Sequence, residues 1–539
     1  MSPLARFREG HAREAALAAV CAILFLTFLD NTIVSVALAG LQSDLGVSVT
    51  GLQWIVDGYM LAFAALMLTG GTLGDLFGRK KVMLVGVAIF CAGSVVAAVA
   101  TGTNMLITGR IVMGVGAAAS EPGTLSLIRH IYPERRDRAV ALGVWTAVSG
   151  LALSLGPVIG GVLVGWQGWR AVFWFGVAFA AVAFVVAAVT LTESSDPWLA
   201  VGERSTSRAS TASPSMLPAQ RRKLDLPGLV VGAGAILLAT FAVIEGENGG
   251  YGTWWIGVLF AGSIALLVLF VLVERRAPDP VLKLEFLRDP TFTAANLVAF
   301  AANLSIFSVF FFTALYLQLI SNFSGFRIAL AFASLAIAMI VAGPFAGWWT
   351  ARVGPRVPMV LGCALSGLGL LLVDWKLTVT TSVGALAWTL AIAGLGFGIA
   401  LVSVTAAVLG AVPAEQSGMA ASTVNTSREL GGVFGVAVLG SVVNTQLTAG
   451  LTEKLIKLHI PLEFRQLVIQ IVTTGGSTNA ADYPIAKGHV KQVQEVFDAA
   501  AGSAGNGIHL SLQIGAGVVL SAAVVAVFAA HRVPQRETA

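Results

Sequence analysis

Charged residues are scarce in this sequence. Asp, Glu, Lys and Arg make up 11% of the 539 residues, whereas a soluble globular chain carries about 25% charged residues. Hydrophobic residues account for 56%, and the mean hydropathy is +0.84. This composition argues against an ordinary soluble protein and predicts one embedded in a lipid bilayer.

Cysteine and histidine are also rare. The three cysteines, Cys21, Cys91 and Cys363, lie in apolar runs, which argues against a disulfide framework or a metal cluster. The six histidines flank apolar runs or fall in a long late loop: His11, His130, His459, His489, His509 and His531. Because no histidine lies at mid-membrane depth, proton chemistry inside the bilayer is expected to use carboxylates.

Motifs for nucleotide chemistry are missing. The sequence has no G-x-x-x-x-G-K-[ST] loop and no recognisable catalytic constellation. It therefore predicts neither an ATP-driven pump nor an enzyme, and it indicates no cofactor and no metal. The pI of about 9.2 reflects basic loops and not nucleic-acid binding.

Long apolar runs dominate the sequence. We identify about fourteen, most of them about 20 residues or longer, which is the length a helix needs to cross a bilayer. They do not alternate as the strands of a membrane barrel do, so helices are expected. The predicted spans are 15–40, 51–73, 82–101, 104–128, 139–164, 171–192, 227–246, 254–273, 291–320, 328–350, 357–375, 384–412, 417–445 and 509–530.

The basic residues predict topology. Lys and Arg concentrate in the segments on the side of the N-terminus, which places both termini inside the cell. The expected architecture is an all-α polytopic membrane protein of two six-helix bundles with two inserted helices. Its parts are an N-terminal bundle (1–193), a cytoplasmic linker (194–226), the inserted helices (227–290) and a C-terminal bundle (291–539) with an extracytoplasmic loop (446–508).

A weak internal repeat supports two equivalent halves. Gly71–Lys80 (GTLGDLFGRK) follows the second span, and Gly347–Arg356 (GWWTARVGPR) follows the tenth. Their glycines match at an offset of about 276 residues, a pattern typical of transporters built from parallel halves.

The first copy of the repeat predicts a gating loop. Gly71 and Gly78 permit close helix approach and unusual φ values. Asp75 is expected to cap a neighbouring helix or to pair with an arginine, and Arg79 keeps the loop inside. The alternative is an ordinary basic loop on the inner side.

Two charges are predicted deep in the bilayer near the start of the sequence. Asp30 lies about 15 residues into the first span, where an ionisable group is costly and is a functional hypothesis by default. Arg110 in the fourth span lies at a compatible depth and is the expected partner. We interpret the pair as proton-coupling, with a purely structural ion pair as the alternative.

The fourth span predicts one wall of a cavity. Arg110, Gly114, Ala117 and Glu121 share one helical face over about 16 Å. Glu121 is the second candidate for proton coupling, or it binds a cationic substrate. The alternative interpretation is close packing between two polar ends.

The thirteenth and fifth spans supply further candidates. Asn425 and Arg428 share a stripe of the thirteenth span, while Glu429 lies about 100° away. In the fifth span, Gly156 and Gly160 predict tight helix packing, and Pro157 permits a bend. The predicted substrate cavity comprises Asp57, Tyr59, Met113, Glu121, Asn425, Arg428 and Glu429.

Taken together, the motifs resemble the major facilitator superfamily, specifically its 14-helix drug:proton antiporters of the EmrB/QacA type. The resemblance covers nearly the whole chain. It rests on the inner loop above and on five further segments: Leu29–Leu38 (LDNTIVSVAL), Trp54–Tyr59 (WIVDGY), Leu106–Ala118 (LITGRIVMGVGAA), Gly156–Gly161 (GPVIGG) after Gly150, and Ser427–Gly432 (SRELGG).

The chain departs from the family pattern at four places. Ala39 replaces the usual proline after the first signature, and Met113 and Glu429 replace usual glutamines. The usual Asn-x-Pro of the sixth span is absent from Phe173–Ala180 (FWFGVAFA). These departures bear on the type of substrate.

The resemblance implies a proton-coupled antiporter driven by the proton gradient. It would export hydrophobic or amphipathic compounds, such as antibiotics, by alternating access. We expect a monomer in the bacterial cytoplasmic membrane whose partners are the substrate, protons and lipid. The alternatives are an exporter of an endogenous lipid, siderophore or secondary metabolite, a proton-symport importer, and a receptor or channel without coupled transport.

Overall fold

The computed structural model describes residues 3–45, 47, 49–193, 225–278, 280, 282–321, 323, 325–413, 416–457 and 490–529. All regular structure in this part is helical. The helices before residue 194 are α1 (Pro3–Ile33), η1 (Val34–Ala37), α2 (Leu38–Leu45), α3 (Val49–Phe77), α4 (Arg79–Ala98), α5 (Thr103–Ser120), α6 (Pro122–Ile131), α7 (Arg135–Gln167) and α8 (Arg170–Thr190).

The helices after residue 224 continue the pattern. They are α10 (Leu226–Gly249), α11 (Trp254–Glu274), η2 (Phe286–Arg288), α12 (Pro290–Ser308), η3 (Val309–Thr313), α13 (Ala314–Leu319), α14 (Gly325–Val353), α15 (Arg356–Lys376), α16 (Val383–Gly410), α17 (Ser417–Lys457) and α19 (Val490–Ala529).

Each of the fourteen predicted spans falls on a described helix or on consecutive helices. Among the described residues, thirteen stretches are long and apolar enough to cross a bilayer, and α3 contributes a shorter apolar segment, Trp54–Met67. The predicted linker 194–226 lies outside the described residues, apart from its last two positions. The all-helical membrane fold is therefore confirmed, whereas the inside location of both termini stays a prediction.

The late loop is shorter than predicted. We expected a loop over 446–508, but α17 continues to Lys457 and α19 begins at Val490. The two extensions pack closely against each other. A Cβ added at Gly450 of α17 would lie only 2.1 Å from Ser503 Oγ of α19. The rest of the predicted loop lies outside the described residues.

Three predicted spans are interrupted. The first contains the 3-10 turn η1 between α1 and α2. The fourth bends where α5 ends and α6 begins at Pro122, which has no N–H to donate to the preceding turn. The ninth contains the π-helical turn η3 between α12 and α13. Such turns are rare in helices and are frequent at functional sites.

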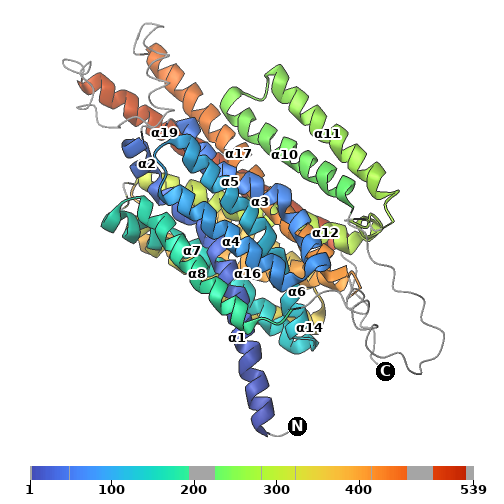
Figure 1. The fold of residues 1–539 in the computed structure, drawn as a ribbon. Helices are drawn as coiled ribbons and strands as arrows, with labels where there is room; N and C mark the ends of the chain where they lie inside the picture. Colours follow the sequence, from blue (N-terminus) through green and yellow to red (C-terminus); the bar gives the residue numbers. More distant parts are fainter. Residues whose placement is uncertain are drawn as a thin grey trace, which may run out of the picture.

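The helices before α10 pack together, as do those after α11. In the first group α1 contacts α7 and α8, and α5 contacts α3 and α4; in the second, α16 contacts α14 and α15, and α12 contacts α17 and α19. The groups meet where α7 packs on α14 and α3 packs on α17. The α10–α11 pair stands at the edge of the bundle, with α10 against both α3 and α17 (Figure 1).

The internal repeat is visible in the backbone. Gly78 separates α3 from α4 with φ of 102°, and Gly354 separates α14 from α15 with φ of 84°. Side chains disfavour this left-handed region, so both turns favour glycine. The two halves thus share a turn at equivalent positions.

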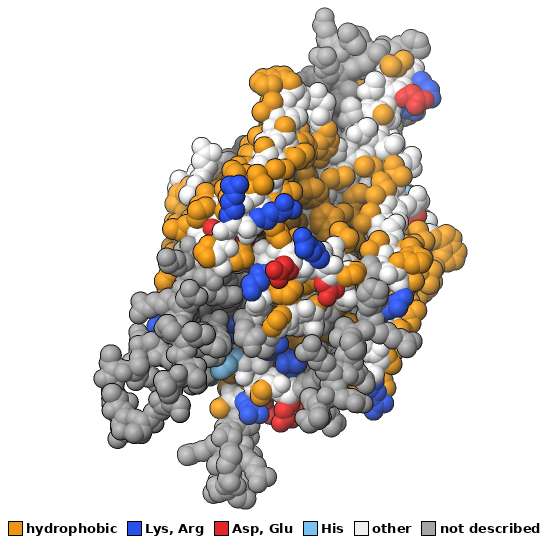
Figure 2. All heavy atoms as spheres, turned by 90° about the vertical axis from the view of Figure 1, so that its right-hand side faces the viewer, with side chains coloured by type: hydrophobic (Ala, Val, Ile, Leu, Met, Phe, Trp, Pro, Cys, Tyr) orange, Lys and Arg blue, Asp and Glu red, His pale blue; other side chains and the backbone are white. Residues whose placement is uncertain are grey.

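The outer surface suits lipid contact. On α11 the large apolar side chains of Trp254, Val258, Ile264 and Leu267 are exposed. Figure 2 shows hydrophobic side chains covering continuous parts of the face that lies to the right in Figure 1. A soluble protein rarely exposes apolar patches of this extent.

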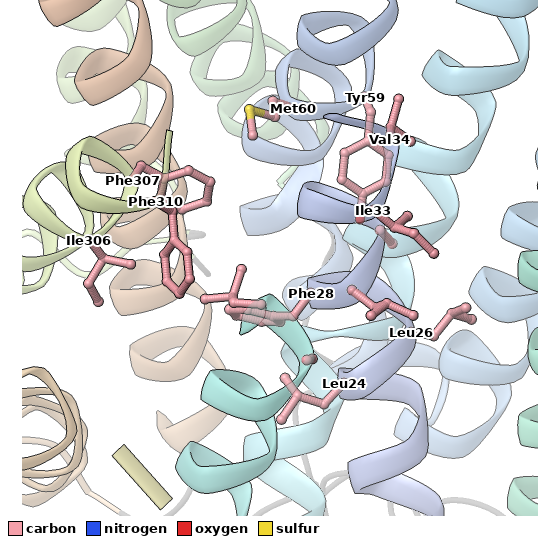
Figure 3. Close-up of a cluster of buried hydrophobic side chains, with 14 of the residues drawn as sticks. Leu24, Leu26, Phe28, Ile33, Val34, Tyr59, Met60, Ile306, Phe307 and Phe310 are labelled. Carbon is pink, nitrogen blue, oxygen red and sulfur yellow. The ribbon is translucent and has the colours of Figure 1, made fainter. Parts of the chain in front are cut away.

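The interior is also apolar. One hydrophobic cluster extends across both groups of helices and includes Phe28, Tyr59, Ile306 and Phe310. In Figure 3, Phe28 of α1 points toward the side on which Ile306 and Phe310 lie, whereas Tyr59 lies on the other side. A charged side chain is costly in this apolar interior, so each buried charge is a candidate functional residue.

Candidate functional site: two buried charge clusters

The first cluster is the ion pair of Asp30 and Arg110. Asp30 is 6% exposed and Arg110 is 1% exposed, and the Nη1 of Arg110 pairs with Oδ2 of Asp30. The Nε of Arg110 donates to the carbonyl of Ile55 at 2.8 Å, and its guanidinium lies 4.5 Å from the centre of the Tyr59 ring. The contact predicted from helix depth is therefore present.

This pair joins three helices. Asp30 lies on α1, Arg110 on α5, and Ile55 and Tyr59 on α3. The Tyr59 hydroxyl donates to the carbonyl of Thr27 on α1 at 3.2 Å. Removing one partner of such a buried pair leaves an uncompensated charge in the apolar core, which is strongly destabilising.

The second cluster surrounds Arg428 on α17. Its Nη2 donates to Thr405 Oγ1 at 2.5 Å and to the carbonyl of Leu401 at 3.2 Å, both on α16. Its Nη1 donates to Asn425 Oδ1 at 3.4 Å. The guanidinium lies 5.5 Å from the centre of the Trp145 ring on α7. Arg428 thus connects the second group of helices to the first.

Two buried carboxylates complete the second cluster. Glu121, at the junction of α5 and α6, is 1% exposed, and Glu429 on α17 is 4% exposed. Glu121 interacts electrostatically with both Glu429 and Arg428. Glu121 and Glu429 belong to different groups of helices, so relative movement of the groups changes the distances within this cluster.

Tyr59 contacts the first cluster and lies within electrostatic range of the second. This side chain interacts electrostatically with Asp30, Arg110, Glu121 and Glu429. It is fully buried. The structure therefore places the three predicted proton-coupling residues and most of the predicted cavity residues in two buried charge clusters within an apolar core.

Two predicted cavity residues lie elsewhere. Met113 packs at the contact between α4 and α5, where its Cγ would lie 2.8 Å from a Cβ on Gly93. Asp57 interacts with Glu245 of α10, and Glu245 Oε1 accepts a hydrogen bond from Trp54 Nε1 at 2.9 Å. The surroundings of Asp57 therefore include α10. The sequence of α3 alone could not predict this neighbour.

The predicted structural glycines lie at close contacts. A Cβ on Gly71 of α3 would lie 1.6 Å from Ser422 Oγ on α17, which places Gly71 where the two groups meet. A Cβ on Gly156 of α7 would lie 2.0 Å from Thr32 Oγ1 of α1, and one on Gly160 would lie 2.8 Å from the carbonyl oxygen of Ile33. The side chain of Pro157 lies outside the described part.

The turn at Gly78, between α3 and α4, contacts the end of α8. The Nζ of Lys80 donates to the carbonyls of Ala188 and Leu191, both at 2.7 Å, and the Lys80 N–H donates to Glu193 Oε1 at 3.1 Å. A cation at the carboxyl end of a helix satisfies free carbonyls and interacts favourably with the helix dipole. The Asp75 side chain lies outside the described part, so its predicted capping or pairing role stays a prediction, as does the gating role of Arg79.

Three polar contacts in the structure were not predicted from the sequence. Trp145 donates from Nε1 to Thr124 Oγ1 at 3.1 Å beside Arg428. The other two are the Glu245 contact and a pair between Asp374 of α15 and His509 of α19, 2.6 Å apart. These contacts could have been suspected from the sequence, because a polar side chain inside an apolar run needs a polar partner within the protein.

Comparison with known proteins identifies the family. The sequence model of the Major Facilitator Superfamily matches residues 20–436. The chain is 31% identical over 431 residues to the multidrug resistance protein Stp of Mycobacterium tuberculosis, covering 79% of this chain and 75% of that protein. It is 29% identical over 448 residues to the tetracenomycin C resistance and export protein of Streptomyces glaucescens, covering 83% and 78% of the two chains.

A solved structure supports the same fold. The human organic anion transporter MFSD10 aligns with a TM-score of 0.59 at 15% identity, over 95% of this chain and 99% of that one. The family model and these relatives make the protein a membrane transporter. The chain belongs to the Major Facilitator Superfamily, as the motifs predicted.

Proposed function

We propose that this protein is a proton-coupled antiporter that exports hydrophobic or amphipathic compounds across the bacterial cytoplasmic membrane. The observation that carries the proposal is the buried Asp30–Arg110 pair. Desolvation favours the protonated form of a carboxyl group, and an adjacent cation favours the ionised form. Movement that separates the two residues therefore favours proton uptake by Asp30.

Coupling follows from this exchange of partners. While Arg110 contacts Asp30, the carboxylate stays ionised. When α1 and α5 part, an isolated charge at this depth costs about 3 kcal/mol or more, and a proton from the outer side removes that cost. Proton binding thus stabilises one facing state, and proton release to the inside restores the ion pair.

The polar region between the two groups of helices is the proposed substrate route. It offers acceptors on Glu121 and Glu429 and donors on Asn425 and Arg428, within a cluster of apolar side chains such as Phe28. This mixture suits an amphipathic compound with a few hydrogen-bonding groups. The Stp and tetracenomycin proteins are named for resistance and export, which supports drugs or antibiotics as substrates.

A second candidate is the export of a compound that the producing cell makes. The name of the tetracenomycin C protein joins resistance with export, which favours a secondary metabolite as an alternative cargo. The mechanism would be the same, and only the polar groups that the cluster recognises would differ.

The function is tested with the purified chain in proteoliposomes. An imposed pH gradient should drive accumulation of a fluorescent amphipathic dye, with ethidium as the probe, and the dye should in turn move protons. Preloaded ethidium should accelerate its own uptake, because only a carrier shows exchange. Transport of the dye without any response to the pH gradient would contradict proton coupling, and uptake without exchange acceleration would indicate a channel.

A further inference from the structure

Asn31 is a buried side chain without a polar partner. It lies on α1 directly after Asp30 and is 8% exposed. Within the described part of the chain, neither its Oδ1 nor its Nδ2 makes a hydrogen bond. A carboxamide can accept two hydrogen bonds and donate two, so the full capacity of this group is unused. Neither lipid nor apolar side chains can satisfy it.

The neighbouring polar side chains of α1 do have partners. Thr27 Oγ1 donates to a backbone carbonyl of its own helix at 3.0 Å. Asp30 pairs with Arg110, and Thr32 Oγ1 donates to a backbone carbonyl of α7 at 2.9 Å. Asn31 is therefore the exception in a segment whose other polar side chains are satisfied.

Tyr59 closes the usual way in which Asn31 could satisfy itself. An asparagine inside a helix can donate to the carbonyl four residues before it, as Asn296 and Asn303 of α12 do at 2.9 and 3.1 Å. For Asn31 that acceptor is the carbonyl of Thr27, which already accepts the Tyr59 hydroxyl at 3.2 Å. In an α-helix this carbonyl also accepts the backbone N–H four residues on, so both of its lone pairs are used. Tyr59 thus keeps the side-chain amide available.

The amide lies on the side of α1 that faces the second group of helices. Residues three apart lie near one face of a helix, so Asn31 follows Phe28 about one turn along α1. Phe28 points toward the side on which Ile306 and Phe310 of the second group lie (Figure 3). These three apolar residues belong to one hydrophobic cluster. The amide is therefore a polar group beside an apolar, partly aromatic surface, which parting of the two groups uncovers.

We propose that Asn31 is a specificity-determining residue that binds a carboxamide or lactam group of the exported compound. Such a group complements the Asn31 amide, because each offers a donor and an acceptor side by side. A planar apolar body next to the group would pack on Phe28, as ligands do in sites that combine apolar walls with a few polar groups. The inference deepens the proposed function by naming a class of cargo, and access to Asn31 rests on the alternating access proposed there.

Equilibrium binding to the purified full-length chain tests this recognition without a proton gradient. The probes are β-naphthamide and its N,N-dimethyl derivative, which share the planar apolar body and the carbonyl oxygen but differ in the N–H donors. We expect wild-type protein to bind β-naphthamide about tenfold more tightly, because the dimethyl derivative leaves Oδ1 of Asn31 unpaired in a buried site. Isothermal titration calorimetry measures both dissociation constants.

Matched variants assign the preference to the amide. Asn31→Leu keeps the branched shape of the side chain and should bind the two probes equally. Tyr59→Phe frees the Thr27 carbonyl, so the Asn31 amide can turn back onto it and the preference should fall. Added to Asn31→Leu, Tyr59→Phe should change the preference no further. Asn303→Leu is the control and should retain the preference, because the Asn303 amide donates within its own helix.

Two results would overturn the proposal. One is wild-type protein that binds both probes equally or does not bind β-naphthamide. The other is a preference that survives in Asn31→Leu. A purely structural role of Tyr59 would weaken the binding of both probes alike in Tyr59→Phe, which would contradict its positioning role. Circular dichroism verifies that each variant is folded, and the wild-type comparison is decisive even if a variant is not. Failure of gradient-driven transport leaves these dissociation constants unaffected, so the proposed function and this inference fail separately.

Discussion

The contact between Gly71 and Ser422 offers a direct way to shift the balance between facing states. It lies where α3 of the first group meets α17 of the second, near the end of the helices that carries Gly78. At the other meeting point of the groups, a Cβ on Gly343 of α14 would lie 2.7 Å from the carbonyl oxygen of Gly143 on α7. Both groups therefore touch closely in the present conformation.

A methyl group at position 71 does not fit this contact. The added Cβ would lie 1.6 Å from Ser422 Oγ and 2.8 Å from Ser422 Cβ, so α3 and α17 must move apart. Overpacking of this kind costs about 1–3 kcal/mol. Because the clash exists only while the groups touch, we expect Gly71→Ala to disfavour this closed end by about 5- to 150-fold relative to the opposite state.

Three further variants define the origin of the effect. Ser422→Gly should rescue Gly71→Ala, because it removes both clashing atoms. Gly74→Ala should be silent, since its nearest neighbour would be a carbon of Arg79 at 3.8 Å. Gly70→Ala should lower stability without shifting the balance, because it would strike Ala118 within the same group of helices.

Double electron–electron resonance spectroscopy measures the change in the balance between the facing states. Spin labels at the exposed positions Phe77 and Val353 mark the ends of equivalent helices in the two groups. The label distance should lengthen in Gly71→Ala and return in the Gly71→Ala/Ser422→Gly double variant. An unchanged distance distribution in Gly71→Ala would refute the reasoning, as would an equal shift in Gly74→Ala.

Two further predictions concern packing and helix capping. Gly156→Ala should lower the thermal midpoint and reduce dye export, because its Cβ would lie 2.0 Å from Thr32 Oγ1. The control Gly161→Ala faces open space and should leave the midpoint unchanged. Equal midpoints for the two variants would contradict this prediction. Lys80→Met should lower the thermal midpoint because it leaves two carbonyls at the end of α8 without their donor. The matched control Lys81→Met should change the midpoint less, and the reverse order would exclude the capping role.

The sequence was sufficient for the fold because lipid imposes strong local constraints. Apolar runs of spanning length must be helices, so the fourteen spans were found from length and hydropathy alone. Break points were harder to place. Pro122 marks one of them, but the bend there depends on how α6 packs, and the π-helical turn at Val309–Thr313 has no equally plain residue signal.

A contact within the site could be predicted from the sequence only where the depth of the two residues in the membrane determined it. Asp30 and Arg110 meet because each is a lone charge at a similar depth in the first group of helices. The approach of Glu121 to Glu429 depends on how the two groups dock, and helix faces alone do not fix that. Met113 shows the same limit, because its residue type does not reveal that it packs toward α4.

The most direct test of the central hypothesis is pH-gradient-driven ethidium transport by Asp30→Asn in proteoliposomes, compared with Glu121→Gln. Asparagine resembles the protonated carboxyl group permanently and cannot exchange a proton. We predict that Asp30→Asn keeps ethidium exchange at equilibrium and loses accumulation driven by the pH gradient. Full gradient-driven accumulation by Asp30→Asn, together with its loss in Glu121→Gln, would contradict the account and assign proton coupling to the cluster around Arg428.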